Sequence, residues 1–323
     1  MLSLSGLQLR FRNSKRFLVL AAVVATSFAA WAATNERGIM VREAVLYLSP
    51  DRNSAKLADV ERGREVVVLE KSGNWAHVFA SVAGTLRSRD VSGWVLDKAI
   101  VRATIPNGDQ VIYGAAVDAE SEASRRHGRR GAADDALRLY SRVPEYFPQS
   151  PLAAEAAYRA ADIRWQLERD QVMSRPSAKE RDPHMRGQIN EDLMRAVMKK
   201  YPHTKWADLA AFHLIDNKVC GDWQGESKCP EKEADMYEKY AAEHPQSPAA
   251  AEALYNAAWR CAALIEIYKT ENAAGKSTDV RRRALSLTQR IASQYPQTDW
   301  ASRAQTLGYL VEQNVPAYGG GVE

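Results

Sequence analysis

Cysteine and histidine are the residues of this sequence whose chemistry depends most on spacing and surroundings. Two of the three cysteines, Cys220 and Cys229, flank the polar segment GDWQGESK, which contains two glycines. A disulfide can close such a loop, and the chain-entropy model gives it about 2–3 kcal/mol of stabilisation. The spacing is not usual for zinc, and no second pair of ligands lies nearby. We therefore predict a Cys220–Cys229 disulfide. Cys261 lies in the helical apolar pattern NAAWRCAALIEIY and is predicted to be a buried side chain rather than a nucleophile.

The histidines form no known catalytic or metal-binding pattern. None lies three or four residues from another, and none belongs to an H-E-x-x-H motif. The sequence also lacks a G-x-S-x-G elbow, a P-loop and a G-x-G-x-x-G loop. We predict a protein that is not an enzyme and has no cofactor or metal; an active site assembled from scattered residues is the alternative. The six histidines are His77, His127, His184, His203, His213 and His244.

The first 32 residues have the composition of an export signal. They contain four basic and no acidic residues, and the apolar run FLVLAAVVATSFAA extends from Phe17 to Ala30. Ala30 and Ala32 place an A-x-A cleavage site before Ala33. Because the run is shorter than the ~20 residues that span a bilayer, we predict a cleaved signal and a periplasmic or secreted protein. The alternative is an uncleaved inner-membrane anchor. No cysteine directly follows the apolar run, so a lipid anchor is not predicted.

The excess positive charge of the chain belongs to this segment. The whole sequence has 44 basic and 40 acidic residues, and removal of residues 1–32 leaves 40 of each. A formally neutral protein lacks the basic footprint of a nucleic-acid-binding protein. The one dense basic run, RRHGRR from Arg125, is predicted to be a solvated loop between helices. Nucleic acid is therefore not an expected partner.

Residues 38–104 are predicted to form a small all-β domain. The segment REVVVLEKSGNWAHVFA alternates apolar and polar residues, is rich in valine and has a turn at 72–74. VSGWVLDKAIV has the pattern of one further short strand, and Gly63 marks another turn. Short strands and turns over about 60 residues favour a small barrel.

This domain resembles a bacterial SH3 domain. That family has a turn glycine before a valine-rich strand, an Asn/Gly-Trp pair that opens the next strand, and a late Gly-Trp-Val. Here Gly63 precedes VVV, NW ends at Trp75, and GWV is centred on Trp94. The resemblance implies a barrel whose edge contacts cell-wall material or proteins, with Trp75 and Trp94 as the candidate surface. The alternative is that both tryptophans pack in the small core.

An internal repeat dominates the rest of the chain. YFPQSPLAAEAAY, from Tyr146, and EHPQSPAAAEALY, from Glu243, start 97 residues apart and agree at nine of thirteen positions. YPHTKWADLA and YPQTDWASRA are two weaker copies. All four have a proline, Ser or Thr two residues later, and Ala five and eight residues later. The aligned residues are Pro148, Ser150, Ala153, Ala156, Pro202, Thr204, Ala207, Ala210, Pro245, Ser247, Ala250, Ala253, Pro296, Thr298, Ala301 and Ala304.

Each copy predicts a helix, a tight turn and a second helix. Proline cannot continue the first helix, and Ser or Thr caps the second. In two copies a proline, Pro151 or Pro248, follows the serine at the expected first helical position. The two alanines share one face of the second helix, where a neighbour can approach closely. We expect helix pairs at 107–126 with 132–147, 151–170 with 187–201, 205–219 with 231–244, and 248–270 with 279–295, then a last helix at 299–312 and a flexible tail at 314–323.

Residues 105–313 resemble tetratricopeptide (TPR) repeats, in which small residues line the first helix and a proline ends the second. They are most similar to the long-spaced repeats of periplasmic TPR proteins of the outer-membrane-protein assembly lipoprotein and Tol–Pal coordinator type. The copies are 43–54 residues apart rather than 34, and the usual Trp and Leu-Gly pair is absent. The resemblance implies a multidomain chain, with an SH3-like barrel followed by an all-α TPR-like solenoid whose groove binds peptides. Candidate groove residues are Arg159, Arg164, Trp165 and Arg260; ordinary surface or packing between repeats is the alternative.

These features favour an exported, non-catalytic adaptor or scaffold. Its expected partners are cell-envelope proteins or peptides held in the groove, while the SH3-like domain contacts protein or peptidoglycan. One alternative is a peptidoglycan-binding module in which the repeats act as a spacer. Another is an accessory protein of a cell-wall hydrolase system.

Overall fold

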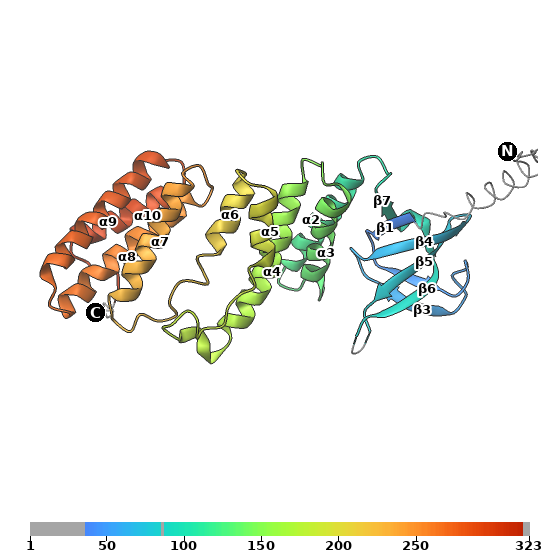
Figure 1. Cartoon of the computed structure of the whole chain (residues 1–323), viewed down its shortest axis with the longest axis horizontal. Helices are drawn as coiled ribbons and strands as arrows, with labels where there is room; N and C mark the ends of the chain where they lie inside the picture. Colours follow the sequence, from blue (N-terminus) through green and yellow to red (C-terminus); the bar gives the residue numbers. More distant parts are fainter. Residues whose placement is uncertain (1–35, 85–86, 319–323) are drawn as a thin grey trace, which may run out of the picture.

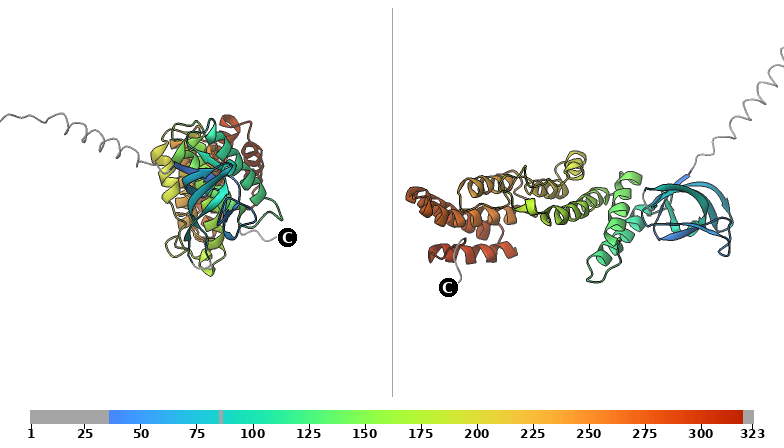
Figure 2. Two further views of the ribbon diagram at one scale, coloured as in Figure 1. Left: turned by 90° about the vertical axis from the view of Figure 1, so that its right-hand side faces the viewer. Right: turned by 90° about the horizontal axis from the view of Figure 1, so that it is seen from below.

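The computed structural model of the chain describes residues 36–84 and 87–318 (Figure 1). In this part a seven-stranded antiparallel sheet comes first and nine α-helices follow it. The molecule is elongated. The sheet lies at one end, and the helices follow one another along the long axis to α9 and α10 at the other end (Figure 2). The predicted export signal lies outside the described residues.

The strands are short and joined mostly by tight turns. They are β1 Glu36–Met40, β2 Ala44–Tyr47, β3 Lys56–Val60, β4 Glu65–Ser72, β5 Trp75–Val82, β6 Arg89–Leu96 and β7 Ile100–Arg102. β4 and β5 form the predicted hairpin, and Gly73 in its turn has a φ of 57°. The segment predicted as a single strand around Trp94 is two strands, because a 3-10 turn at Asp97–Ala99 separates β6 from β7.

The strand order is β3-β2-β6-β5-β4-β1-β7. One face of the sheet buries a valine-rich core that includes Met40, Leu46 and Val78. The sheet is not closed, since its hydrogen-bonded ladder ends at β3 on one side and β7 on the other. Closure into a barrel is therefore not observed. β7 is only three residues long, because the chain leaves the sheet after Arg102 to enter the first helix.

The helices vary in length from two to six turns. They are α2 Gly108–Ala123, α3 Ala132–Tyr146, α4 Ala153–Met173, α5 Asp192–Lys200, α6 Lys205–His213, α7 Lys228–Glu243, α8 Ala250–Thr270, α9 Ala274–Gln294 and α10 Asp299–Glu312. None of these helices has both the length and the apolar character needed to cross a bilayer.

The proline phrases lie at the turns from α3 to α4, α5 to α6, α7 to α8 and α9 to α10, as predicted. The residue before each proline caps the helix that ends there: the Phe147 N–H, for example, donates to the Val143 carbonyl at 2.9 Å. The alanines that follow are buried. Those eight residues after the prolines are all 0% exposed, namely Ala156, Ala210, Ala253 and Ala304. Small side chains thus allow neighbouring helices to approach closely, as the repeat predicts.

The helix caps differ between copies. Thr204 caps α6 as predicted, accepting the N–H three residues on at 3.2 Å. Ser150 and Ser247 instead accept the N–H two residues on, at 3.1 Å in both cases. The proline after each serine belongs to a turn, and the α-helix begins only at Ala153 or Ala250. In the two PQSP copies the helix therefore starts later than the repeat predicts.

The third expected helix pair departs from the prediction. α6 ends at His213 rather than near residue 219, and an irregular segment at 214–227 separates it from α7. Long side chains join the two helices. The Phe212 and Tyr240 rings lie 5.2 Å apart, and the Tyr240 hydroxyl donates to the Asp208 carbonyl at 2.8 Å. The segment closed by the Cys220–Cys229 disulfide occupies this place in the chain, and α6 and α7 do not pack as closely as the other pairs.

The predicted Cys220–Cys229 disulfide is present, and Cys261 is buried and free, as predicted.

The predicted flexible tail is wrong for residues 314–318. Ala317 packs against the core formed by α7 to α10, and the Tyr318 ring lies 5.2 Å from Trp223 in the disulfide loop. This aromatic contact holds the segment; residues 319–323 lie outside the described part.

The sheet and the helices meet at the loop between β3 and β4. Gly63 has a φ of 75°, and a Cβ built there would lie 2.6 Å from the Cβ of Arg138 on α3. The Arg138 Nε donates to the Arg62 carbonyl at 2.9 Å, and the Arg142 Nε donates to the Gly63 carbonyl at 3.2 Å. Ile39 of β1 belongs to the same buried cluster as α2 and α3. The two parts therefore share a packed boundary.

Gly63→Ala is expected to destabilise the protein more than Gly73→Ala. Both glycines have a positive φ, so either alanine costs about 1 kcal/mol of backbone strain. A Cβ at Gly73 meets nothing within 4 Å, whereas one at Gly63 meets α3. Urea unfolding should show an additional loss of about 1–3 kcal/mol for the Gly63 variant. Equal losses for the two variants would contradict the close contact between this loop and α3.

The disulfide predicts both a thiol count and a stability difference. Denatured, unreduced protein should expose one reactive thiol, that of Cys261. Replacing both Cys220 and Cys229 by Ser should lower the free energy of unfolding by about 2–3 kcal/mol. As a control, reductant should destabilise the native protein but not the double-serine variant. Three reactive thiols before reduction would show that the bond is absent.

Candidate functional site

Two aromatic pairs lie at equivalent positions in the two halves of the helical region. Tyr158 of α4 stacks on Trp206 of α6, with ring centroids 5.4 Å apart. Tyr255 of α8 packs against Trp300 of α10, with centroids 5.2 Å apart. In both pairs the tyrosine lies ten residues after one repeat proline, and the tryptophan lies four residues after the next. The repeat therefore has a larger unit of two copies, first α3 to α6 and then α7 to α10.

A cation covers each tryptophan. The Lys205 Nζ lies 4.4 Å from the Trp206 ring centroid, and the Arg303 guanidinium carbon lies 4.6 Å from that of Trp300. The two cations are exposed, while the aromatic rings are half-buried. Each contact contributes about 0.5–1 kcal/mol at an exposed site. We refer to the first stack, which is Tyr158, Trp206 and Lys205, and to the second stack, which is Tyr255, Trp300 and Arg303.

Ionisable side chains lie near both stacks. The His213 Nε2 lies 3.2 Å from the Tyr158 hydroxyl and 3.2 Å from the Asp162 Oδ1. Glu252 of α8 is half-buried, and this burial raises the pKa of its carboxyl group, while His213 and Arg303 oppose the shift. Glu252 is therefore electrostatically coupled to both stacks.

Two of the predicted groove residues are interior. Trp165 is 1% exposed, and its indole N–H donates to the Asp216 Oδ2 at 3.3 Å. The side chain of Arg260 is 11% exposed, its Nε donates to Glu233 at 2.7 Å, and its guanidinium lies 4.5 Å from the Tyr237 ring centroid. Neither side chain is available to line an open groove, so the prediction is wrong for both; they pack neighbouring helices together.

Glu233 is the centre of this interior polar cluster. Its carboxylate is buried and accepts the backbone N–H of Cys220 at 2.9 Å and the indole N–H of Trp223 at 3.1 Å, in addition to Arg260. The disulfide loop is therefore fixed to α7 and α8 by a hydrogen-bonded carboxylate as well as by its covalent bond.

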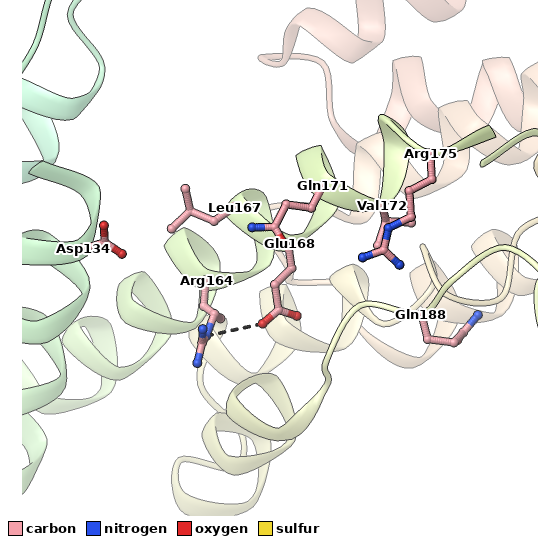
Figure 3. Close-up of a pocket in the computed structure, with 8 residues that line it drawn as sticks. All are labelled: Asp134, Arg164, Leu167, Glu168, Gln171, Val172, Arg175 and Gln188. Atoms are coloured by element: carbon pink, nitrogen blue, oxygen red, sulfur yellow. Dashed lines mark ion pairs between the residues drawn. The ribbon is translucent and has the colours of Figure 1, made fainter. Parts of the chain in front are cut away.

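Arg159 and Arg164 occupy different surroundings. Arg159 is half-buried among α2, α3 and α4, where it donates to Glu120, Glu155 and the Tyr140 hydroxyl. Arg164 is exposed, as expected of a groove residue, and lines a cavity of about 450 Å³ together with Asp134 and Arg175 (Figure 3). Its Nε lies 3.4 Å from the Glu168 Oε1. Two arginines and two carboxylates line this cavity, so their charges balance.

The two SH3-like surface candidates lie outside the core of the sheet. Trp75 meets Tyr47 edge to face, with centroids 5.8 Å apart, and Trp94 stacks on His77 at 5.0 Å. Both tryptophans are half-buried. They lie on the adjacent strands β5 and β6, two positions apart in the register, and Tyr47, which pairs with Trp94, also contacts Trp75. Of the two tryptophans, Trp75 borders a cavity (described below).

The two stacks were not predicted from the sequence, although the residues that form them recur there at fixed positions in the repeat. Comparing alternate copies, rather than all four together, reveals the shared tyrosine and tryptophan.

In residues 36–84 and 87–318, no three His, Cys, Asp or Glu side chains are grouped so that they could hold a metal ion. No protein-family model matches the chain, and the search of curated proteins finds no match.

The interior position of Arg260 predicts a large effect of its removal. Arg260→Leu leaves the Glu233 carboxylate buried without its cation, and this should cost about 3–5 kcal/mol of stability. The matched control is Arg164→Leu, because Arg164 pairs with Glu168 at the surface; it should cost about 1 kcal/mol or less. Chemical unfolding of the two variants measures the difference. Similar losses would contradict the interior position of Arg260.

Proposed function

We propose that this protein is an exported, non-catalytic adaptor that holds protein partners in the periplasm or cell envelope. The observation that carries the proposal is the equivalence of the two stacks. Packing of the helices needs the proline and the small alanines, and all four copies have those. The paired rings and exposed cations recur only once in each two-copy unit, and this points to a docking role in addition to packing.

The fold behind this proposal is an SH3-like β domain followed by a TPR-like solenoid. Helices joined by proline turns and packed through small residues support the second part, and short antiparallel strands with a valine-rich core support the first. Export is supported by the composition of the first 32 residues and by the disulfide, since disulfides persist in oxidising compartments.

Each stack has the composition of a docking point. Tryptophan, tyrosine and arginine are the residues that most often dominate binding energy at protein interfaces. The second stack has all three, and the first has a lysine in place of the arginine. The exposed Lys205 and Arg303 favour partner segments that place an acidic side chain next to an apolar one. Two such points, one in each unit, fit a partner that presents this pattern twice.

Charge reversal tests the docking role without disturbing the interior. Lys205→Glu with Arg303→Glu should abolish most of the crosslinked capture of partners from envelope fractions, because both docking points then repel acidic segments. The control is Lys232→Glu with Arg169→Glu, which changes two exposed cations away from the stacks by the same charge. Each single reversal should weaken capture by about tenfold or less, and the double reversal by more.

Circular dichroism of both double variants should match that of the unchanged protein. Equal capture by the stack variant and the control variant would overturn the proposal. So would unchanged capture after deletion of residues 105–313.

A further inference from the structure

A cavity of about 310 Å³ lies on the sheet, away from the helical stacks. Side chains of β2, β5 and β6 line it, together with the loops that follow β1, β2 and β6. Its apolar wall includes Val45, Val95 and Ala99. The volume is at the lower end of the range for sites that hold small ligands.

The cavity is bordered by an aromatic corner. Tyr47 and Trp75 meet with their ring planes at 88°. Both rings are half-buried and border the cavity rather than the core of the sheet. They therefore offer a flat apolar surface to a molecule in the cavity.

Three cations surround this corner. Arg42, Arg52 and Lys98 line the cavity and are exposed, and no ion pair engages any of them in the described part of the chain. The acid next to Lys98 in the sequence, Asp97, is already paired with Lys71 and Arg102. Glu43 is the acidic residue of the lining, so the lining has a net charge of +2.

We infer that this cavity binds a small ligand that has two or more anionic groups, carboxylate or phosphate, beside a flat apolar face. Uncompensated cations around a low-dielectric wall concentrate a positive potential at the cavity. Arginine is suited to both kinds of anion, because its guanidinium donates two parallel hydrogen bonds to a carboxylate or a phosphate. The aromatic corner contacts the apolar face of the ligand.

This site is independent of the proposed adaptor function. It uses strands and loops of the β region only, whereas the docking role uses α4, α6, α8 and α10. Loss of one activity should therefore leave the other in place, and the variants below can be checked for unchanged partner capture.

Calorimetric titration of the purified protein tests the site with three probes. Benzene-1,3,5-tricarboxylate has three carboxylates around a flat ring, citrate has three carboxylates without a ring, and tripolyphosphate supplies phosphate without a ring. We expect the ring-bearing probe to bind at least about fivefold more tightly than citrate. The ratio of the affinities for citrate and tripolyphosphate shows whether the cations prefer carboxylate or phosphate.

The decisive variant is the triple change Arg42→Gln, Arg52→Gln and Lys98→Gln. It should weaken binding of benzene-1,3,5-tricarboxylate by about tenfold or more. The matched control changes three exposed helical cations, Arg169, Lys199 and Lys232, to Gln, and should change the affinity by less than about twofold. Trp75→Leu should reduce the preference for the ring-bearing probe over citrate and leave citrate binding in place.

Two results would overturn the inference. One is equal affinity of the unchanged protein and the Arg42/Arg52/Lys98 variant for benzene-1,3,5-tricarboxylate. The other is the absence of saturable binding of all three probes up to about 10 mM at low salt. Because the changed side chains are exposed, thermal unfolding should show that both triple variants fold normally.

Discussion

The proline that ends every second helix, from α3 to α9, is the constraint on which the helical region depends. Because proline lacks an N–H group and disfavours helical angles in the residue before it, these four helices stop at the same point of each copy. That stop fixes the turn, and the turn brings the buried alanine face of the next helix onto its neighbours. A first helix one turn longer would displace this face by about 5 Å, too far for a contact made by alanine.

Fixing the helix ends with a few residues leaves the positions between them free to differ. Tyrosine and tryptophan recur at such positions in alternate copies, which divides the helical region into two units with the same aromatic contact. The junction between the units is the irregular segment 214–227. There Glu233 and the disulfide supply the order that close helix packing supplies elsewhere.

Local patterns were sufficient for much of the fold. The helix ends, the buried alanines, the disulfide and the β4–β5 hairpin each follow from proline, residue size, cysteine spacing or alternation within a short stretch of chain. Trp165 and Arg260, which were wrongly predicted to line a groove, depend on partners that are distant in the sequence. Trp165 packs in an apolar cluster with residues 194–214 and donates to Asp216, 51 residues away, and Arg260 donates to Glu233, 27 residues away. Nothing near either residue in the sequence distinguishes it from a surface position. The open sheet and the packed Tyr318 likewise depend on where the chain goes next.

The burial of Cys261 has a consequence for the chemistry of the disulfide. Burial raises the pKa of its thiol to about 12. Exchange requires a thiolate, and at neutral pH only about one in 10⁵ of such thiols is ionised. Once folded, the chain therefore has no internal nucleophile able to attack the Cys220–Cys229 bond. The third cysteine of the chain is thus poorly suited to exchange with the disulfide in the folded protein.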